Sequence, residues 1–349
     1  MGIRILGAAM SDEMEIWFER GVTDGLPVVP PTRERVERMI QATARPREAL
    51  VAEVPPNFGR ATVEKLAVNA VMAGCRPEYL PVVLAVVEAA CDPRFNLHGQ
   101  SGTTNATSPL IIINGPVRPR LGVNCAAGVF GPGFRANATI GRALRLVMIN
   151  LGGTRAGEIS MSTLGHPGRY TYCIGEHEEV SPWEPLHVER GHGPGQSTVT
   201  VFPGEGPFII NDHLSREAPQ LVASLGWSAA GVWNHKSFPL YGHTLWVIGP
   251  EHAKTIGSAG WTKQDVKRYL FETVRRRARE LEPGPDGAES GRLKNLGASD
   301  PDALVPKFPS AEEIMVVVAG GTAGRFSAVV PGWMGGEIGA HPVTRVIEA

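Results

Sequence analysis

The fold is decided by two stretches of the sequence, Leu110-Ile-Ile-Ile113 and Gly131-Pro-Gly-Phe-Arg-Ala-Asn-Ala-Thr-Ile-Gly-Arg-Ala-Leu-Arg145. The first segment is short and fully apolar, which predicts a buried strand. In the second, two glycines and a proline predict a bend, and Ile140, Ala143 and Leu144 share the apolar stripe of a helix. A buried strand followed by an amphipathic helix is typical of α/β proteins.

The same order returns in the second half of the chain. His243 to Ile248 predicts a strand that ends at Gly249-Pro250, and a helix is expected over Lys263 to Arg279. Ile314 to Ala319 predicts a further buried strand. We therefore expect an α/β fold with mixed, partly parallel sheets flanked by helices, in which two halves can be related.

Several further helices are expected before the first strand. Thr32 is a candidate N-cap for a helix that starts near Arg33, Thr62 to Ala73 predicts a helix that stops at Gly74, and Pro77 starts another that reaches Ala90. We expect four segments: a main α/β domain with a glycine-rich anion site over 1–200, a second α/β segment and candidate weak repeat over 201–281, a loop-rich linker over 282–311, and a C-terminal strand returning to the core in 312–349.

Composition narrows the class of protein. The chain has 349 residues, a formal net charge of −1, 42 glycines and 29 prolines. This small charge predicts no attraction to nucleic acid or a membrane surface, and no apolar run reaches the length of a membrane span. The first residues lack a signal-peptide pattern, so we expect a cytoplasmic protein. Its four cysteines form no C-x-x-C pair and are expected to be thiols.

The helix after the glycine bend predicts an anion site. Arg135, Asn137, Thr139 and Arg142 lie in its first turns, where backbone N–H groups lack partners and the helix dipole is positive. Helix N-termini of this kind bind carboxylates and phosphates. The alternative is an ordinary helix start with solvated arginines.

Two more residues are candidates for substrate binding. His98 and Asn105 precede the first strand, and their side chains could line a pocket above the sheet, although turns also use such residues. The Gly320-Gly-Thr-Ala-Gly324 turn lacks the Walker lysine and the dinucleotide glycine spacing, so neither ATP nor NAD is predicted and the cofactor stays unknown.

Cys75 is the first choice for a reactive thiol. It stands between the Gly74 helix stop and the Arg76-Pro77 helix start, and a helix N-terminus beside a guanidinium lowers a thiol pKa. The alternative is a buried structural thiol. Cys125 is the second choice, and Cys173 is expected in the core.

An acidic loop predicts acid–base chemistry. Residues 176–189 gather carboxylates and imidazoles between prolines, and we expect His177 and Glu178 to form the proton-transfer pair. A solvated acidic turn is the alternative. Metal binding by His177, His187 and a carboxylate fits no zincin spacing, so no metal ligand is assigned. To act together, this loop and the Gly131–Arg142 bend must lie side by side.

Five motifs resemble a poorly characterised bacterial family that accompanies, or is fused to, UGSC-type (seleno)protein domains. They are Asp24-Gly-Leu-Pro-Val-Val-Pro-Pro-Thr32, Asn69-Ala-Val-Met-Ala-Gly-Cys-Arg-Pro-Glu-Tyr-Leu-Pro81, Arg135-Ala-Asn-Ala-Thr-Ile-Gly-Arg142, Ser181-Pro-Trp-Glu-Pro-Leu-His-Val-Glu-Arg190 and Ala319-Gly-Gly-Thr-Ala-Gly-Arg-Phe-Ser-Ala328. The resemblance implies thiol redox chemistry. This chain has no Cys-Gly-Ser-Cys, so the resemblance implies a separate UGSC- or CGSC-motif subunit in a hetero-oligomer.

Together these patterns predict an enzyme, or a subunit of one, that acts on a small anionic, carboxylate-like metabolite. Arg135, Asn137 and Arg142 would hold the anion, Cys75 would supply the thiol, and His177 or Glu178 would move protons. The expected reaction is thiol-dependent redox or addition–elimination chemistry, of the oxidoreductase or lyase class. The alternatives are a metal-assisted hydrolase or hydratase, and a non-catalytic scaffold that docks a UGSC-type partner.

Overall fold

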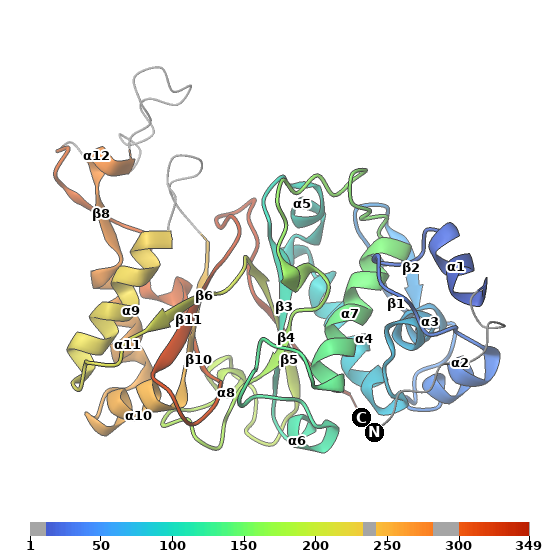
Figure 1. The fold of residues 1–349 in the computed structure, drawn as a ribbon, viewed down its shortest axis with the longest axis horizontal. Coiled ribbons are helices and arrows are strands. Elements are labelled where there is room, and N and C mark those ends of the chain that lie inside the picture. Colours follow the sequence, from blue (N-terminus) through green and yellow to red (C-terminus); the bar gives the residue numbers. More distant parts are fainter. Residues whose placement is uncertain (1–11, 233–241, 282–299, 349) are drawn as a thin grey trace.

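The computed structural model describes residues 12–232, 242–281 and 300–348 (Figure 1). Its sheets contain both parallel and antiparallel strand pairs and are flanked by helices, so the predicted α/β class is confirmed. Two four-stranded sheets lie in the middle of the molecule, with helices on the outer side of each. The layers therefore run helix, sheet, sheet, helix. Most of the linker expected over 282–311 lies outside the described residues.

The first sheet contains the fully apolar segment that opened the sequence analysis. Its strands lie in the order β12 (Val343–Val346), β5 (Thr198–Gly204), β3 (Ser108–Asn114) and β4 (Cys173–Gly175). Only β3 and β4 are parallel. Ile111 and Ile113 face the helices, whereas Leu110 and Ile112 face the second sheet. Because both faces of β3 are covered, the strand is continuously apolar rather than alternating.

The second sheet has the same plan. Its strands lie in the order β10 (Ile314–Val318), β7 (Thr244–Ile248), β11 (Phe326–Pro331) and β6 (Phe208–Asn211). Again one neighbouring pair, β10 with β7, is parallel and the others are antiparallel. Side chains of the two sheets meet in a shared core, which includes Leu110, Ile112, Phe202, Leu245, Val247, Met315 and Val317.

Each sheet borrows one edge strand from the other half of the chain. In the first half, β3, β4 and β5 form the first sheet, and the chain then crosses to add β6 to the second. In the second half, β7, β10 and β11 form the second sheet, and β12 returns to the first. The two halves therefore have one topology, and each completes the sheet of the other.

Two helices, α4 (Leu80–Ala90) and α7 (Arg135–Asn150), pack on the outer face of the first sheet. On their far side lies α3 (Val63–Ala73), which packs on both, and α2 (Arg33–Ile40) packs on α3. The expected caps are present, because Thr32 and Thr62 accept backbone N–H bonds and Gly74 ends α3 at φ 89°. The segment from Pro77 begins as a 3₁₀ turn and becomes α4 at Leu80. Since α4 packs on β5, β12, α3 and α7, it is apolar on nearly every side.

The outer face of the second sheet is covered by α9 (Ala218–Val232), α10 (Pro250–Ser258) and α11 (Lys263–Thr273). The expectation that the last helix continues to Arg279 is wrong. Residues Arg275–Arg277 form β8, which pairs antiparallel with β9 (Leu304–Pro306). Their backbone groups bond to a distant segment instead of continuing the helix, which sequence periodicity cannot show.

The remaining elements lie around these layers. They are α1 (Asp12–Glu19), β1 (Leu50–Val54), β2 (Gly59–Thr62), α5 (Leu97–Gly102), α6 (Val117–Leu121), α8 (Leu186–Glu189) and α12 (Ala278–Leu281). Among the described residues, no helix combines the length and the apolar character needed to cross a bilayer.

Candidate functional site

The candidate site lies where the carboxyl ends of parallel strands meet between the two sheets. In the first sheet, β3 ends at Asn114 and β4 ends at Gly175. The backbone N–H of His177, just beyond β4, donates to the carbonyl of Val318 at the end of β10 (2.7 Å). Three strand ends therefore converge here, and this edge is where α/β sheets usually bind ligands.

A buried polar network joins the residues at the ends of β3 and β4. Asn114 Nδ2 donates to Glu176 Oε2 (2.6 Å) and to Glu178 Oε1 (3.0 Å). The backbone N–H groups of Leu186 and Gly115 donate to Glu176 and Glu178, respectively (both 2.7 Å). Asn114 and Glu176 are fully buried, and burial raises the pKa of Glu176. The raised pKa favours a protonated, neutral Glu176 in this network.

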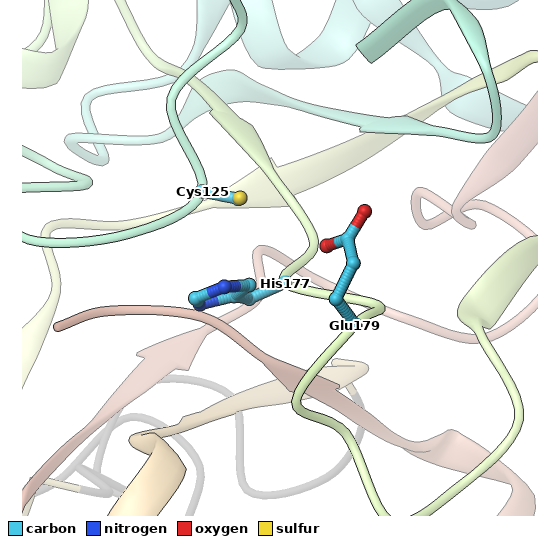
Figure 2. A group of neighbouring side chains, drawn as sticks. All are labelled: Cys125, His177 and Glu179. Atoms are coloured by element: carbon cyan, nitrogen blue, oxygen red, sulfur yellow. The ribbon is translucent and has the colours of Figure 1, made fainter. Parts of the chain in front are cut away.

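Next to this network, Cys125, His177 and Glu179 form a compact group (Figure 2). The sulfur of Cys125, one ring nitrogen of His177 and one carboxylate oxygen of Glu179 all lie within 4.8 Å of one another. Arg118, from α6, joins the group. Its Nη1 donates to Cys125 Sγ at 3.1 Å, and its Nη2 donates to Glu179. A thiol, an imidazole, a carboxylate and a guanidinium thus share one small space.

In this group, burial and the charge of Arg118 shift the pKa values of Cys125 and Glu179 in opposite directions. Burial raises the pKa of the Cys125 thiol above its usual value, although the Arg118 charge and hydrogen bond act in the opposite direction. Burial also disfavours ionisation of Glu179, but Arg118 outweighs it and holds the pKa of Glu179 below its usual range. These shifts favour the protonated thiol of Cys125 and the ionised carboxylate of Glu179, whose side chain is 59% exposed.

The loop that carries Cys125 is anchored by α7. Asn137 of this helix accepts a hydrogen bond from the Asn124 N–H (2.7 Å) and donates to the Asn124 and Cys173 carbonyls. The Gly175 N–H donates to the same Asn124 carbonyl (2.9 Å). This shared carbonyl places the start of the acidic loop (residues 176–189) beside α7. The loop and the Gly131–Arg142 bend must lie side by side if they are to act together.

Gly320, from the second half of the chain, connects Cys125 with His177. Its N–H donates to the Cys125 carbonyl (2.8 Å), and its own carbonyl lies 3.4 Å from His177 Nδ1. Because a carbonyl only accepts, Nδ1 carries the proton in this contact. When the ring is neutral, a proton on Nδ1 leaves the lone pair on Nε2, which can then act as a base or as a ligand.

Cys75 does not have the predicted environment. Its thiol is buried and donates to the Thr139 carbonyl (3.3 Å), and burial raises its pKa to about 12. The expectation of a lowered pKa is therefore wrong, because α7 covers the sulfur and keeps water from stabilising a thiolate. Cys173 lies buried in β4, as expected for a core thiol.

The three residues expected to hold an anion have different surroundings. Arg142 forms a two-point ion pair with Asp24, whose side chain is 2% exposed, and also donates to the Pro27 carbonyl. An internal carboxylate thus occupies Arg142, which corrects its assignment to an external anion. Asn137 is likewise used internally, as a bridge between loops. Arg135 remains exposed at the start of α7, with its Nε on the Gly74 carbonyl.

His98 and Asn105 do not lie at this site, which corrects their assignment to it. They precede β3, whereas the site follows its last residue, and a seven-residue strand is roughly 20 Å long. His98 is exposed beside the Phe58 ring, and Asn105 donates to Glu205 (2.8 Å). Both residues therefore lie near the opposite end of β3.

The sequence analysis did not single out Arg118 and Asn114, and it placed Cys125 second to Cys75. His177 and Glu178 are in place, although Glu178 is held by Asn114, Gly115 and Arg118 rather than free to move a proton. One signal was available: Asn114 ends the first predicted strand, and polar residues at parallel strand ends meet at one edge. Among the described residues, His187 is not part of the metal-competent group formed by Cys125, His177 and Glu179.

Comparison with known proteins finds no similar protein. No family model matches the chain, and neither a curated protein nor a solved structure matches it significantly.

Proposed function

We propose that this chain is an enzyme that acts on a small carboxylate metabolite through the thiol of Cys125. The observation that supports it most is the group of Cys125, His177 and Glu179 within 4.8 Å, with Arg118 on the sulfur. A nucleophilic cysteine needs a nearby base that is held in a fixed orientation. His177 supplies the base, and the Gly320 carbonyl orients its ring. The proposal thus keeps the predicted thiol chemistry and moves it from Cys75 to Cys125.

The anionic substrate class follows from the Arg118–Glu179 pair. Arg118 is almost fully buried, whereas the Glu179 side chain is more than half exposed and can turn toward water. A substrate carboxylate can then replace Glu179 on the guanidinium, whose fork matches two carboxylate oxygens. Such an exchange keeps the buried charge paired and brings the substrate carbon next to Cys125 Sγ.

The step that this geometry favours is addition of the thiol to an electrophilic double bond. As the S–C bond forms, the S–H bond breaks and the proton moves to His177. The electron pair of the double bond moves to its far atom, which then takes the proton from His177. Elimination is the same sequence in reverse. No oxidant or reductant is consumed.

Redox chemistry requires more than this site holds. Among the described cysteines, Cys75 and Cys173 are buried in the core of the first half, so no second thiol adjoins Cys125 in the group. A dithiol cycle would need a cysteine from another polypeptide. We therefore propose a UGSC- or CGSC-motif subunit as the source of that cysteine if the reaction is a redox reaction.

Alkylation with two probes tests the thiol and its anion preference together. Iodoacetate carries the carboxylate that Arg118 should bind, whereas iodoacetamide is neutral. We expect iodoacetate to label Cys125 of the native protein faster than iodoacetamide does, with both rates falling at least tenfold in His177→Ala. Cys91→Ser is the control, since it removes a partly exposed thiol outside the site. Labelling of Cys125 only after unfolding would overturn the proposal.

A metal-assisted hydrolase or hydratase is the second candidate. Cysteine, histidine and a carboxylate are all zinc ligands, and catalytic zinc sites combine three protein ligands with an open position for water. This candidate predicts about one zinc ion per chain, measured by mass spectrometry of the purified protein, and its loss in Cys125→Ser. The thiol proposal predicts no retained metal, so the same measurement separates the two.

A further inference from the structure

A second pocket, lined by arginines, lies on the helical layer outside the first sheet. It has a volume of about 270 Å³ and is bounded by α2, by the link from α3 to α4, and by the start of α7. Its lining includes Arg35, Arg38, Arg76 and Arg135, which come from these separate parts of the chain. The pocket shares no lining residue with the Cys125 site.

These four guanidinium groups are not ion-paired in the described structure, although Arg35 interacts electrostatically with its exposed neighbour Glu34. No aspartate or glutamate lines the pocket, and none of the four arginines forms an ion pair with a described carboxylate. Arg142, two turns further along α7, shows the usual arrangement, since Asp24 neutralises it. The four arginines are exposed, so water and salt screen part of their mutual repulsion, and an anion bound between them would lower it further.

Backbone carbonyls hold three of these side chains in place. Arg35 Nη1 donates to the Pro30 carbonyl (2.8 Å), Arg38 Nε to the Glu34 carbonyl (3.4 Å) and Arg135 Nε to the Gly74 carbonyl (3.0 Å). A guanidinium has five N–H donors, so each of these arginines keeps several for a ligand. The Arg76 side chain makes no hydrogen bond within the described residues, although its carbonyl accepts one from the Tyr79 N–H (3.0 Å).

The helix ends strengthen this argument. Arg135 is the first residue of α7, whose N-cap Phe134 provides no side-chain cap, and Arg35 lies in the first turn of α2. Cations at these positions oppose the helix dipole and lower stability, whereas anions are favoured there. Two helices therefore start with an unfavourable charge beside the same pocket, which fits a site selected for binding rather than for stability.

We propose that this pocket binds a small phosphate-bearing ligand, such as a phosphate monoester or pyrophosphate. Phosphate carries up to two charges and several acceptor oxygens, which suits convergent arginine forks better than a single carboxylate does. The volume is just below the range of typical small-molecule pockets, so it suits a small ligand. The proposal is independent of the Cys125 chemistry, because the two sites share no residue.

Pyrophosphate binding measured by isothermal titration calorimetry tests the site. We expect Arg76→Gln and Arg135→Gln each to weaken binding about tenfold or more, because each removes a charge-assisted bond. Arg33→Gln is the matched control, since Arg33 lies on α2 but does not line the pocket. Its affinity should stay within about twofold of wild type. The Arg76 side chain has no described partner, so Arg76→Gln should fold normally even if Arg135→Gln does not.

Three outcomes would overturn the assignment. Wild-type protein that binds no pyrophosphate at matched ionic strength has no such site. An equal loss in Arg33→Gln would show only general charge attraction. Tighter binding of malonate than of pyrophosphate would make the pocket a dicarboxylate site. None of these results depends on whether Cys125 reacts with iodoacetate.

Discussion

The two halves of the molecule share a topology but differ where their equivalent strands end. In the first half, β3 ends in Asn114 before Gly-Pro, and Asn114 hydrogen-bonds Glu176 beyond β4. In the second half, β7 ends in Ile248 before Gly-Pro, and Ile248 lies opposite Val318 of β10. All four residues are buried. The same place in the fold thus holds a polar pair in one half and an aliphatic pair in the other.

This difference places the buried polar groups at the strand ends of the first half. Buried polar groups cost free energy unless every hydrogen bond is made, and Asn114 Oδ1 and Glu176 Oε1 have no partner in the described structure. The loop after β4 continues with His177, Glu178 and Glu179, whereas the loop after β10 continues with Ala319, Gly320 and Gly321. The first half supplies titratable side chains, and the second supplies backbone contacts beside them.

The largest expected effect comes from placing the polar residue in the wrong half. Ile248→Asn removes a fully buried aliphatic side chain and leaves an amide without partners, so we expect a loss of about 4 kcal/mol in the free energy of unfolding. Denaturant unfolding measures it, with Ile248→Val, expected to lose about 1 kcal/mol, as control. A loss for Ile248→Asn no larger than this control would mean that the second half also tolerates polar strand ends.

The polar pair of the first half should behave as a unit. Asn114→Leu and Glu176→Leu each leave the other partner with an unmade hydrogen bond, so each should cost about 2 kcal/mol. The double variant should cost less than the two losses added together, with a coupling energy of about 1–2 kcal/mol in a double-mutant cycle. Strictly additive losses would show that the contact between Asn114 and Glu176 contributes nothing to stability.

Glu176 should also make stability depend on pH. Burial raises its pKa in the folded state above the ordinary value of 4.5, so the folded protein retains a proton that the unfolded chain releases. Stability contributed by this proton is full below 4.5 and is lost as pH rises through the folded pKa. Glu176→Gln should therefore gain stability relative to wild type as pH rises above 4.5, by about 1.4 kcal/mol per unit of raised pKa. A pH-independent difference between the two proteins, with surface variant Glu78→Gln as control, would contradict this.

The smallest expected effect tests the backbone contribution of the second half. Gly320 has φ +115°, and an added Cβ would meet only Pro250 at 3.8 Å, so Gly320→Ala is strained by its backbone rather than by crowding. We expect a loss of about 1 kcal/mol together with slower iodoacetate labelling of Cys125, because the contacts of Gly320 with Cys125 and His177 shift. Unchanged labelling despite the lost stability would show that these contacts do not position the site.

Local patterns predicted much of the fold and one part of the site. The apolar runs at residues 110–113 and 314–318 are strands, and Gly74 ends α3 as expected. His177 lies in the predicted loop and in the site. The choice of cysteine failed for a physical reason: Arg76 and a helix start suggested a low pKa at Cys75, but packing against α7 desolvates that sulfur. Burial outweighed the local charge.

The sequence by itself determined the buried strands at 110–113, 244–248 and 314–318 and the helix ends at Thr32, Thr62 and Gly74, because periodicity and caps act within a few residues. Only the tertiary structure decided the exchange of β6 and β12 between sheets, which depends on pairing between distant segments. It also decided the role of each charge. Arg142 meets Asp24 across 118 positions of sequence, and Arg118 meets Glu179 across 61. Electrostatic interactions depend on distance in space and on burial, and both are set only when the layers pack.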